Sequence, residues 1–173
     1  MIIFEDTRNQ MGKHDLKHEY FERNGIEIRR TKLYVGDYTL PFNQTICIDT
    51  KNSIQELIGD VQSDHERFRS EQNRAQEAGI KLIVLVENEG CLLKDKNGTY
   101  QNPTVLCLED LKRWRNPRSY IWKYGRQLHP RAMKGDQLYK ICKTMSERYG
   151  VEFQFCTPQD AGKRVIEILT GGQ

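Results

Sequence analysis

The chain has 173 residues, of which 29% are charged and 37% hydrophobic, and its formal net charge is +3 at pH 7. A chain of this length has room for one domain with a substantial buried core, and the charged fraction describes a soluble, globular protein. A net charge this small permits a nucleic-acid partner without establishing one, so the distribution of charge along the chain matters more than its sum.

Signals for secretion and for a membrane are absent from the sequence. No basic segment followed by an apolar stretch opens the chain, and no apolar run approaches the length that crosses a bilayer. The five cysteines are odd in number and have no C-x-x-C spacing, which argues against a disulfide framework and a zinc site. We therefore expect free thiols and a reducing, cytoplasmic setting.

Three short elements are predicted first. The apolar residues Ile2–Phe4 indicate a strand. Lys13–Asn24 predicts a helix, because apolar side chains recur at helical spacing and Gly25 supplies a stop. Ile26–Arg30 alternates apolar and polar residues, which predicts a strand with one buried face.

The segment Val35–Lys51 predicts two strands joined by a turn at Pro41–Gln44. Its acids lie at the two ends of this hairpin, so an antiparallel fold-back brings Asp37 near Asp49 and Lys51. Side chains alternate between the two faces of a strand, which puts Asp49 and Lys51 on the same side. We therefore expect two carboxylates and one ammonium group to converge at a strand end.

Such a group is suited to a divalent metal and a phosphate. Mg²⁺ prefers a few carboxylate oxygens and keeps several waters, and it can activate a water while neutralising charge on a phosphodiester. A lysine is a compact cation that can steady the water and the scissile phosphate. The same residues can also be solvated charges that keep an exposed edge strand soluble, and the pattern alone leaves both interpretations open.

Two helices and a strand follow the hairpin. Asn52 or Ser53 can cap a helix that runs to Gly59, and Asp64 can cap a second helix. Lys81–Glu87 is a continuous apolar run, best explained as a strand covered on both faces and parallel to its neighbour after a helical crossover. Together these elements predict an α/β fold with a mixed central sheet flanked by helices.

Short motifs run through this half of the chain in a fixed order. They are Asp6-Thr7-Arg8, Gly36-Asp37-Tyr38, Asp49-Thr50-Lys51, Glu56-Leu57-Ile58-Gly59 and Arg67-Phe68, followed by the strand Leu82–Glu87. This order resembles the XPF-type nuclease domain, a branch of the PD-(D/E)xK nucleases, over residues 2–87. The resemblance implies a restriction-endonuclease-like core and metal-dependent cleavage of branched or flapped DNA. A small standalone version resembles recombination or resolvase-like enzymes of bacteria and bacteriophages.

The resemblance also implies roles for the acids and the lysine. Asp37 and Asp49 would hold Mg²⁺ or Mn²⁺, and Lys51 would orient the attacking water and stabilise charge at the phosphate. Asp6 would support a second metal ion or the waters of the first. These four residues are the predicted catalytic group.

Arg8, Arg67 and Glu56 are assigned supporting or phosphate contacts by the same resemblance. The sequence departs from the family pattern around them. Thr50 replaces the middle arginine of the family's Glu-Arg-Lys, and Asn9 replaces the acid that follows Arg8. Glu56 matches the acid after the lysine only with one extra residue. These departures give weight to an alternative, a catalytically silent DNA-binding module on a nuclease scaffold.

Residues 88–135 are the part least like the family. Asn97-Gly98 signals a turn, a helix is expected to begin at Glu109–Leu111, and Asn116-Pro117 interrupts it. The stretch 112–134 contains eight basic residues and no acid, interleaved with large aromatic rings. The sequence therefore predicts a basic, aromatic insertion.

Concentrated cations with flat rings suit the backbone and bases of single strands or junction arms. Predicted DNA contacts are Arg113, Arg115, Arg118, Lys123, Arg126, Trp122 and Tyr124. The alternative is that Trp114, Ile121 and Trp122 pack into the core while the arginines are solvated.

The C-terminal part, 136–173, continues the α/β alternation. Asp136 can cap a helix over Gln137–Tyr149, Val151–Cys156 alternates as a strand, and Thr157-Pro158 opens a closing helix. We predict one nuclease domain over 1–173, with a catalytic core at 1–87, the insertion at 88–135 and a helix-strand-helix at 136–173. A tandem helix-hairpin-helix module has no room, so a homodimer would have to form through the nuclease domain itself.

These observations predict a metal-dependent DNA endonuclease, specific for flap, fork or junction structures in recombination or repair. It would act in the cytoplasm and lie on the nucleoid when bound to DNA. Besides the silent module, a sequence-specific, restriction-like nuclease on the same fold stays open, and it would cleave plain duplex at fixed sites.

Overall fold

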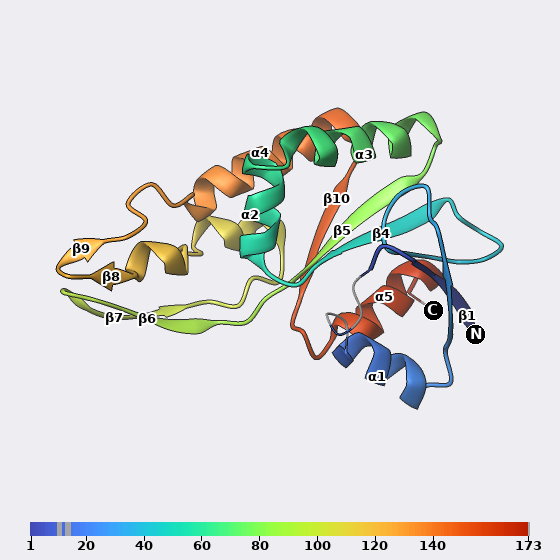
Figure 1. Ribbon diagram of the computed structural model, residues 1–173, viewed down its shortest axis with the longest axis horizontal. Helices are drawn as coiled ribbons and strands as arrows, with labels where there is room; N and C mark the ends of the chain where they lie inside the picture. The colour runs from blue at the N-terminus through green and yellow to red at the C-terminus, as the bar shows by residue number, and fades with distance from the viewer. Residues whose placement is uncertain (10–11, 13–14, 173) are drawn as a thin grey trace.

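The computed structural model describes residues 1–9, 12 and 15–172, and its centre is a six-stranded sheet in the order β10-β5-β4-β3-β1-β2 (Figure 1). The strands are β1 (Ile2–Asp6), β2 (Glu27–Thr31), β3 (Tyr38–Thr39), β4 (Ile46–Lys51), β5 (Lys81–Glu87) and β10 (Glu152–Cys156). β3 is antiparallel to β1 and β4, whereas the other neighbours are parallel. The predicted α/β class with a mixed central sheet is confirmed.

Both faces of β5 are buried, which explains its continuous apolar sequence. Leu82, Val84 and Val86 pack in one hydrophobic cluster. Ile83 and Leu85 pack in another, on the opposite face. The division follows from the two-residue period of a strand, and it gives the sheet a core on each side.

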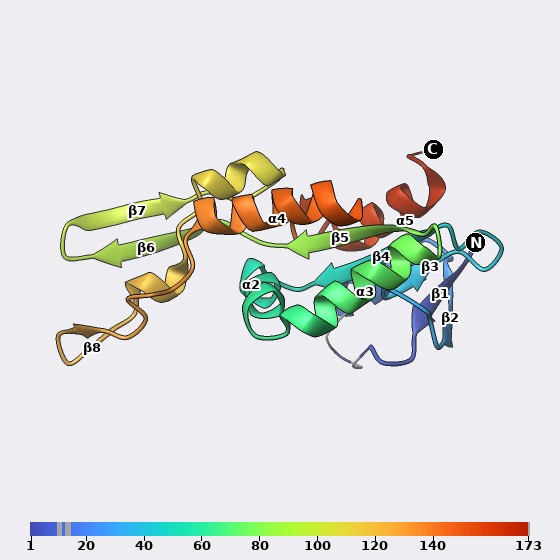
Figure 2. The ribbon, with the colours of Figure 1, turned by 90° about the horizontal axis from the view of Figure 1, so that it is seen from above.

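Helices cover both faces of the sheet (Figures 1 and 2). The first core is closed by α2 (Ile54–Gln62), α3 (His65–Glu77) and α4 (Gly135–Tyr149), and the second by α1 (Asp15–Arg23) and α5 (Ala161–Thr170). In the part of the chain that the structure describes, no helix is both long enough and apolar enough to cross a membrane.

The insertion forms small elements that extend from one end of the sheet (Figures 1 and 2). The Asn97-Gly98 turn is confirmed, because it joins two antiparallel strands. The elements are β6 (Cys91–Asp95), β7 (Gly98–Asn102), the 3₁₀ helices η1 (Leu108–Lys112) and η2 (Pro117–Tyr120), and the hairpin of β8 (Trp122–Lys123) and β9 (Arg126–Gln127).

Several predicted boundaries differ from the structure. The expected start of the first helix at Lys13 lies outside the described residues. Helix α2 continues to Gln62, past the predicted end at Gly59. The prediction that Asp136 caps α4 is wrong, because Lys134 occupies the N-cap and Gly135 is already helical.

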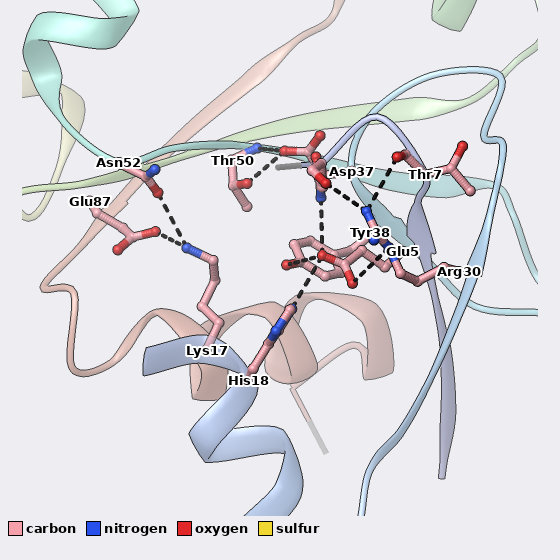
Figure 3. A network of polar contacts seen from close by, with 11 residues as sticks. Glu5, Thr7, Lys17, His18, Arg30, Asp37, Tyr38, Thr50, Asn52 and Glu87 are labelled. Atoms are coloured by element: carbon pink, nitrogen blue, oxygen red, sulfur yellow. Dashed lines mark hydrogen bonds and ion pairs between the residues drawn. The ribbon is translucent and has the colours of Figure 1, made fainter. Parts of the chain in front are cut away.

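A lysine buried between α1 and the sheet was not predicted. Lys17 is 1% exposed, and its ammonium group forms an ion pair with Glu87 at the end of β5 and lies 3.5 Å from the side-chain oxygen of Asn52 (Figure 3). Asn52 directly follows Lys51 at the end of β4. The ion pair therefore ties α1 to the sheet edge that carries the predicted catalytic residues.

Replacing Lys17 with methionine leaves Glu87 as a buried charge without its ammonium partner. We expect Lys17→Met to lower the free energy of unfolding by about 3–5 kcal/mol, measured by urea denaturation. The double variant Lys17→Met/Glu87→Leu should recover much of the loss, because it removes both charges. A Lys17→Met variant as stable as the wild type would show that the pair does not hold α1.

Candidate active site

The β3–β4 hairpin places two aspartates side by side at one end of the sheet. Tyr38 pairs with Ile48, and the amide N–H of Asp37 donates to the carbonyl oxygen of Ile48 at 2.6 Å. Asp37 therefore lies next to Asp49. Gly36 is required at this point, because its φ of +71° is left-handed and an added Cβ would lie 2.8 Å from the Ile48 oxygen.

Thr50 holds the carboxylate of Asp37 (Figure 3). Its amide N–H and its hydroxyl both donate to Asp37 Oδ2, at 2.8 and 2.6 Å. Both bonds go to one oxygen, so they fix the carboxylate without occupying Oδ1. The residue that departs from the family's arginine therefore has a defined role here, which is to orient Asp37.

Lys51 lies between two buried carboxylates. Its Nζ is 2.8 Å from Asp49 Oδ2 and 2.7 Å from Asp60 Oδ2, and it lies 5.3 Å from the centroid of the Phe68 ring. Asp60 was not predicted as a site residue. The sequence feature that could have indicated Asp60 is its position in α2, one turn after Glu56, because this spacing puts both acids on the same helix face.

These side chains line a pocket of about 350 Å³. The residues around it come from β4, α2, α3 and the loops that follow β1 and precede β3. They are Arg8, Asn9, Gly36, Asp37, Asp49, Thr50, Lys51, Asn52, Glu56, Asp60, Arg67, Glu71 and Arg74.

Burial raises the pKa of the carboxyl groups of both Asp37 and Asp49, and the neighbouring charge of Glu71 adds to the effect. Burial acts to lower the pKa of the Lys51 ammonium group, but the charges of Asp49 and Asp60 outweigh it, so the pKa is raised. Lys51 therefore stays protonated and acts as a hydrogen-bond donor and a fixed cation. The pocket holds more carboxylate charge than Lys51 alone neutralises.

Asp6 does not line the pocket within the described part of the chain. Its Oδ1 accepts from the backbone N–H and the Nε of Arg8, at 2.7 and 2.8 Å, and its Oδ2 accepts from Arg8 and from the amide of Leu33. Burial acts to raise the pKa of Asp6, but these hydrogen bonds outweigh it and lower the pKa. Asp6 thus holds Arg8 at the pocket edge, and its role in supporting a metal ion or the waters of that ion stays a prediction.

The other predicted supporting residues have partners inside the pocket. Glu56 accepts a hydrogen bond from the amide of Asn52 at 2.8 Å, so its carboxylate fastens the start of α2. Arg67 donates to Asp60 at 3.1 Å and reaches the pocket from α3. Glu71, four residues after Arg67, accepts from the amide of Gly36 at 2.9 Å and so holds the turn before Asp37.

A second layer of buried polar groups lies beneath the hairpin (Figure 3). Glu5 on β1 is buried, and its Oε1 accepts from the Tyr38 hydroxyl at 3.3 Å and lies 3.2 Å from His18 Nε2. Arg30 approaches the same carboxylate at 3.9 Å. Because Tyr38 directly follows Asp37, this layer fixes the backbone next to the candidate metal ligand.

The residues predicted to contact DNA lie apart from this pocket. Among the described residues, none of Arg113, Arg115, Arg118, Lys123, Arg126, Trp122 and Tyr124 lines it. They lie at the end of the molecule formed by η1, η2, β8 and β9. Trp114 is buried in the core, whereas Ile121 and Trp122 are exposed, so the core alternative is wrong for two of its three residues.

The two carboxylates of Asp37 and Asp49 are a donor set that fits a magnesium-like ion. Within the described residues, no three histidine, cysteine, aspartate or glutamate side chains form a ready-made metal cluster. Mg²⁺ commonly takes only one or two protein carboxylates and completes its shell with water and substrate phosphate. Asp49 Oδ2 is buried and has no hydrogen-bond partner among the described residues, although Lys51 lies within ion-pair distance. A cation there would share Asp49 with Lys51, whereas on Asp37 the two Thr50 bonds go to Oδ2 and leave Oδ1 for it.

Comparison with protein-family models decides the family. The model described as "ERCC4 domain" matches residues 6–169. The chain belongs to the ERCC4 domain family. This match extends well beyond residues 2–87, to which the sequence motifs had pointed. A search of curated proteins finds no match to this chain.

Solved structures give the same fold for this ERCC4 domain. It is similar to "XPF from Aeropyrum pernix", with 14% identity and a TM-score of 0.59, and to the same protein in "complex with DNA", with 16% identity and a TM-score of 0.60. Each match covers 98% of this chain but only 63% of the other, so the ERCC4 domain spans less than two thirds of those chains. The resemblance to the XPF-type nuclease domain is confirmed.

Removal of the Asp49 charge should stabilise the protein in the absence of metal. The raised pKa values of Asp37 and Asp49 mean that the folded state loses stability as the pH rises through them. At neutral pH we expect Asp49→Asn to gain about 1 kcal/mol, or about 2–4 °C in melting temperature, while Lys51 keeps Asp60 as a partner. The gain should shrink at acid pH, where Asp49 is protonated.

Asp6→Asn is the matched control for thermal denaturation without metal. Its pKa is lowered, so its charge stabilises the folded state above the ordinary aspartate range. We therefore expect Asp6→Asn to lower the melting temperature. A decrease for both variants would contradict the account of Asp49.

Proposed function

We propose that this ERCC4 domain is a divalent-metal-dependent DNA endonuclease. The observation that carries the proposal is the buried pocket in which Asp37 and Asp49 face Lys51 with carboxylate charge in excess. The family match and the XPF-type fold support a nuclease, and one of the similar structures is described as a complex with DNA. Phosphodiester hydrolysis is the reaction that this combination of groups suits.

Asp37 and Asp49 would hold Mg²⁺ or Mn²⁺, which supplies an activated water and neutralises charge at the phosphate when bound. Thr50 fixes the orientation of Asp37 through Oδ2. Lys51, which stays protonated, donates a hydrogen bond to the attacking water or to a phosphate oxygen. Arg8, held by Asp6 at the pocket edge, steadies the DNA backbone.

Arg67, Glu56 and Asp60 act around this group. Asp60 holds Lys51 from the side opposite Asp49, and Arg67 lies over Asp60 with its guanidinium largely exposed, where a phosphate can reach it. Glu56 keeps the start of α2 in place. These contacts supply positioning rather than bond chemistry.

DNA with branches is the substrate that we propose, in recombination or repair and at the nucleoid of an intracellular compartment. The support is the cluster of cations and rings at the end of the molecule remote from the pocket, which can engage a second part of a branched substrate. A single domain over 1–173, a homodimer through this domain, and a bacterial or bacteriophage origin stay predictions.

Metal binding should depend on pH because the ligands must be deprotonated. The raised pKa values of Asp37 and Asp49 predict that Mg²⁺ or Mn²⁺ affinity falls as the pH is lowered through them, with protons released on binding. Isothermal titration calorimetry in buffers of different ionisation enthalpy measures both quantities. Asp49→Asn should abolish the titration, and unchanged affinity in that variant would assign the metal elsewhere.

Cleavage should require each member of the central group. We expect Asp37→Ala, Asp49→Ala and Lys51→Ala each to reduce cleavage by at least about 1000-fold while circular dichroism shows a folded protein. The substrates are a flap, a splayed arm, a four-way junction and a plain duplex, each with Mg²⁺ or Mn²⁺. Full activity of Asp49→Ala would contradict the proposed role of Asp49 in cleavage.

The same panel separates the alternatives. Binding of branched DNA without cutting would favour the catalytically silent module, for which the replacement of the family's arginine by Thr50 is the sequence argument. Cutting of plain duplex at fixed positions would favour a restriction-like nuclease. Glu77→Gln, at the exposed end of α3 and away from the pocket, is the charge-removal control and should cut like the wild type.

A further inference from the structure

A second groove, of about 550 Å³, lies between β7, η1, η2 and the start of α4. In the described part of the chain it shares no lining residue with the catalytic pocket. Its walls carry the cations Lys112, Arg113, Arg115 and Lys134, the rings of Tyr100 and Tyr120, and one acid, Asp136.

The floor of this groove is rigid. Helix α4 starts so close to η1 that an added Cβ on Gly135 would overlap the carbonyl oxygens of Leu111 and Trp114. The buried side chain of Asn102 accepts from the amide of Arg115 at 2.8 Å and donates to its carbonyl oxygen at 2.9 Å. The backbone that carries Arg115 is therefore fixed at two points before any ligand arrives.

The Arg115 guanidinium forms a flat, charged surface. It lies 3.6 Å from the centroid of the Tyr100 ring, and its Nη1 donates to the Tyr120 hydroxyl at 3.2 Å. Among the ion pairs of the described residues, Arg113 is paired with Asp110, but Lys112, Arg115 and Lys134 have no carboxylate within 4.0 Å. Of the residues that line the groove, Asp136 is the single acid against four cations, so the groove keeps a net positive charge.

The β8–β9 hairpin, which follows Tyr120, ends in an exposed ring. Tyr124 is 92% exposed, and its φ of +50° is left-handed, a conformation that bulky residues rarely adopt. A turn of this type favours Asn or Gly at that position. The hairpin tip therefore combines a strained backbone conformation with an aromatic ring that is exposed to solvent.

We propose that this groove and hairpin tip form a second nucleic-acid site, which takes a single-stranded DNA segment. The proposal deepens the proposed function, on which it rests for the choice of DNA. Lys112, Arg115 and Lys134 bind phosphates, and unpaired bases stack on the Arg115 plane and on the Tyr124 ring. An acidic protein segment would match the charges but not the exposed flat surfaces.

Helix α2 borders a different hollow on each side. One side of it, with Glu56 and Asp60, lines the catalytic pocket, and the other side, with Gln55 and Ile58, faces Arg118 and the segment 128–133. Asn116 lines both this second hollow and the groove, so a DNA bound at both sites can run past α2. The single-stranded part of a branched substrate would lie at the groove while the scissile phosphate lies at Asp49.

Fluorescence anisotropy tests this site without catalysis, in EDTA, using a labelled thymidine oligonucleotide of about 12 nucleotides and a duplex of equal length. We expect Arg115→Ala and Tyr124→Asn each to weaken binding of the single strand about 10-fold, with a smaller effect on the duplex. Tyr124→Asn should leave the melting temperature unchanged or higher, because Asn tolerates left-handed φ. A structural role for the ring would lower it.

Two variants serve as matched controls. Arg148→Ala removes a cation at the opposite end of α4, and Phe42→Asn removes a fully exposed ring at the β3–β4 turn. Both should change binding less than about 2-fold. Equal effects of all four variants, or a preference for a poly-glutamate peptide over the oligonucleotide, would overturn the proposal.

Failure of this site and failure of the nuclease assignment give different results. If Arg115→Ala and Tyr124→Asn weaken single-strand binding but no substrate is cut with Mn²⁺, the single-strand site is supported and the endonuclease assignment is contradicted. If cutting depends on Asp49 while those two variants bind and cut like the wild type, the endonuclease assignment is supported and the single-strand site is contradicted.

Discussion

The placement of Lys51 between Asp49 and Asp60 is the interaction on which the rest of the pocket depends. A single ammonium group faces two buried carboxylates, at 2.8 and 2.7 Å, and a third, Asp37, lies alongside. Lys51 is thereby kept charged, which suits a donor to phosphate or water. Asp60 is also paired with Arg67, so the carboxylates that stay under-neutralised are those of Asp37 and Asp49, which suits a cation there. A pocket of this kind gives up stability in the empty state for affinity toward charged ligands.

Much of the surrounding structure holds this group in position. Thr50 fixes Asp37 from the neighbouring strand position, Glu71 fixes the turn before it, and Asp6 fixes Arg8 at the edge. The Lys17–Glu87 ion pair secures the same end of the sheet from the opposite face. These contacts explain why buried charged residues gather at one sheet edge: they position one another as well as any ligand.

The candidate active-site pocket and the basic, aromatic insertion lie apart in the molecule. Helix α2 has the candidate active-site pocket on one side and Arg118 with the segment 128–133 on the other. The insertion is fastened to the core by Trp114, and buried asparagines brace its own backbone from within. Its cations are thus presented from a fixed surface rather than from a mobile tail.

The sequence by itself determined the strands of the central sheet, the helices on its faces and the proximity of Asp37, Asp49 and Lys51, because strand alternation and turn chemistry are local. It did not indicate the β8–β9 hairpin. Only the tertiary structure decided which other charges join them. Asp60 meets Lys51 and Lys17 meets Glu87 across distant elements, so no periodicity reveals either pair. The separation of Asp6 from the pocket, and of Trp114 from Trp122, likewise depends on which neighbours the packed fold supplies.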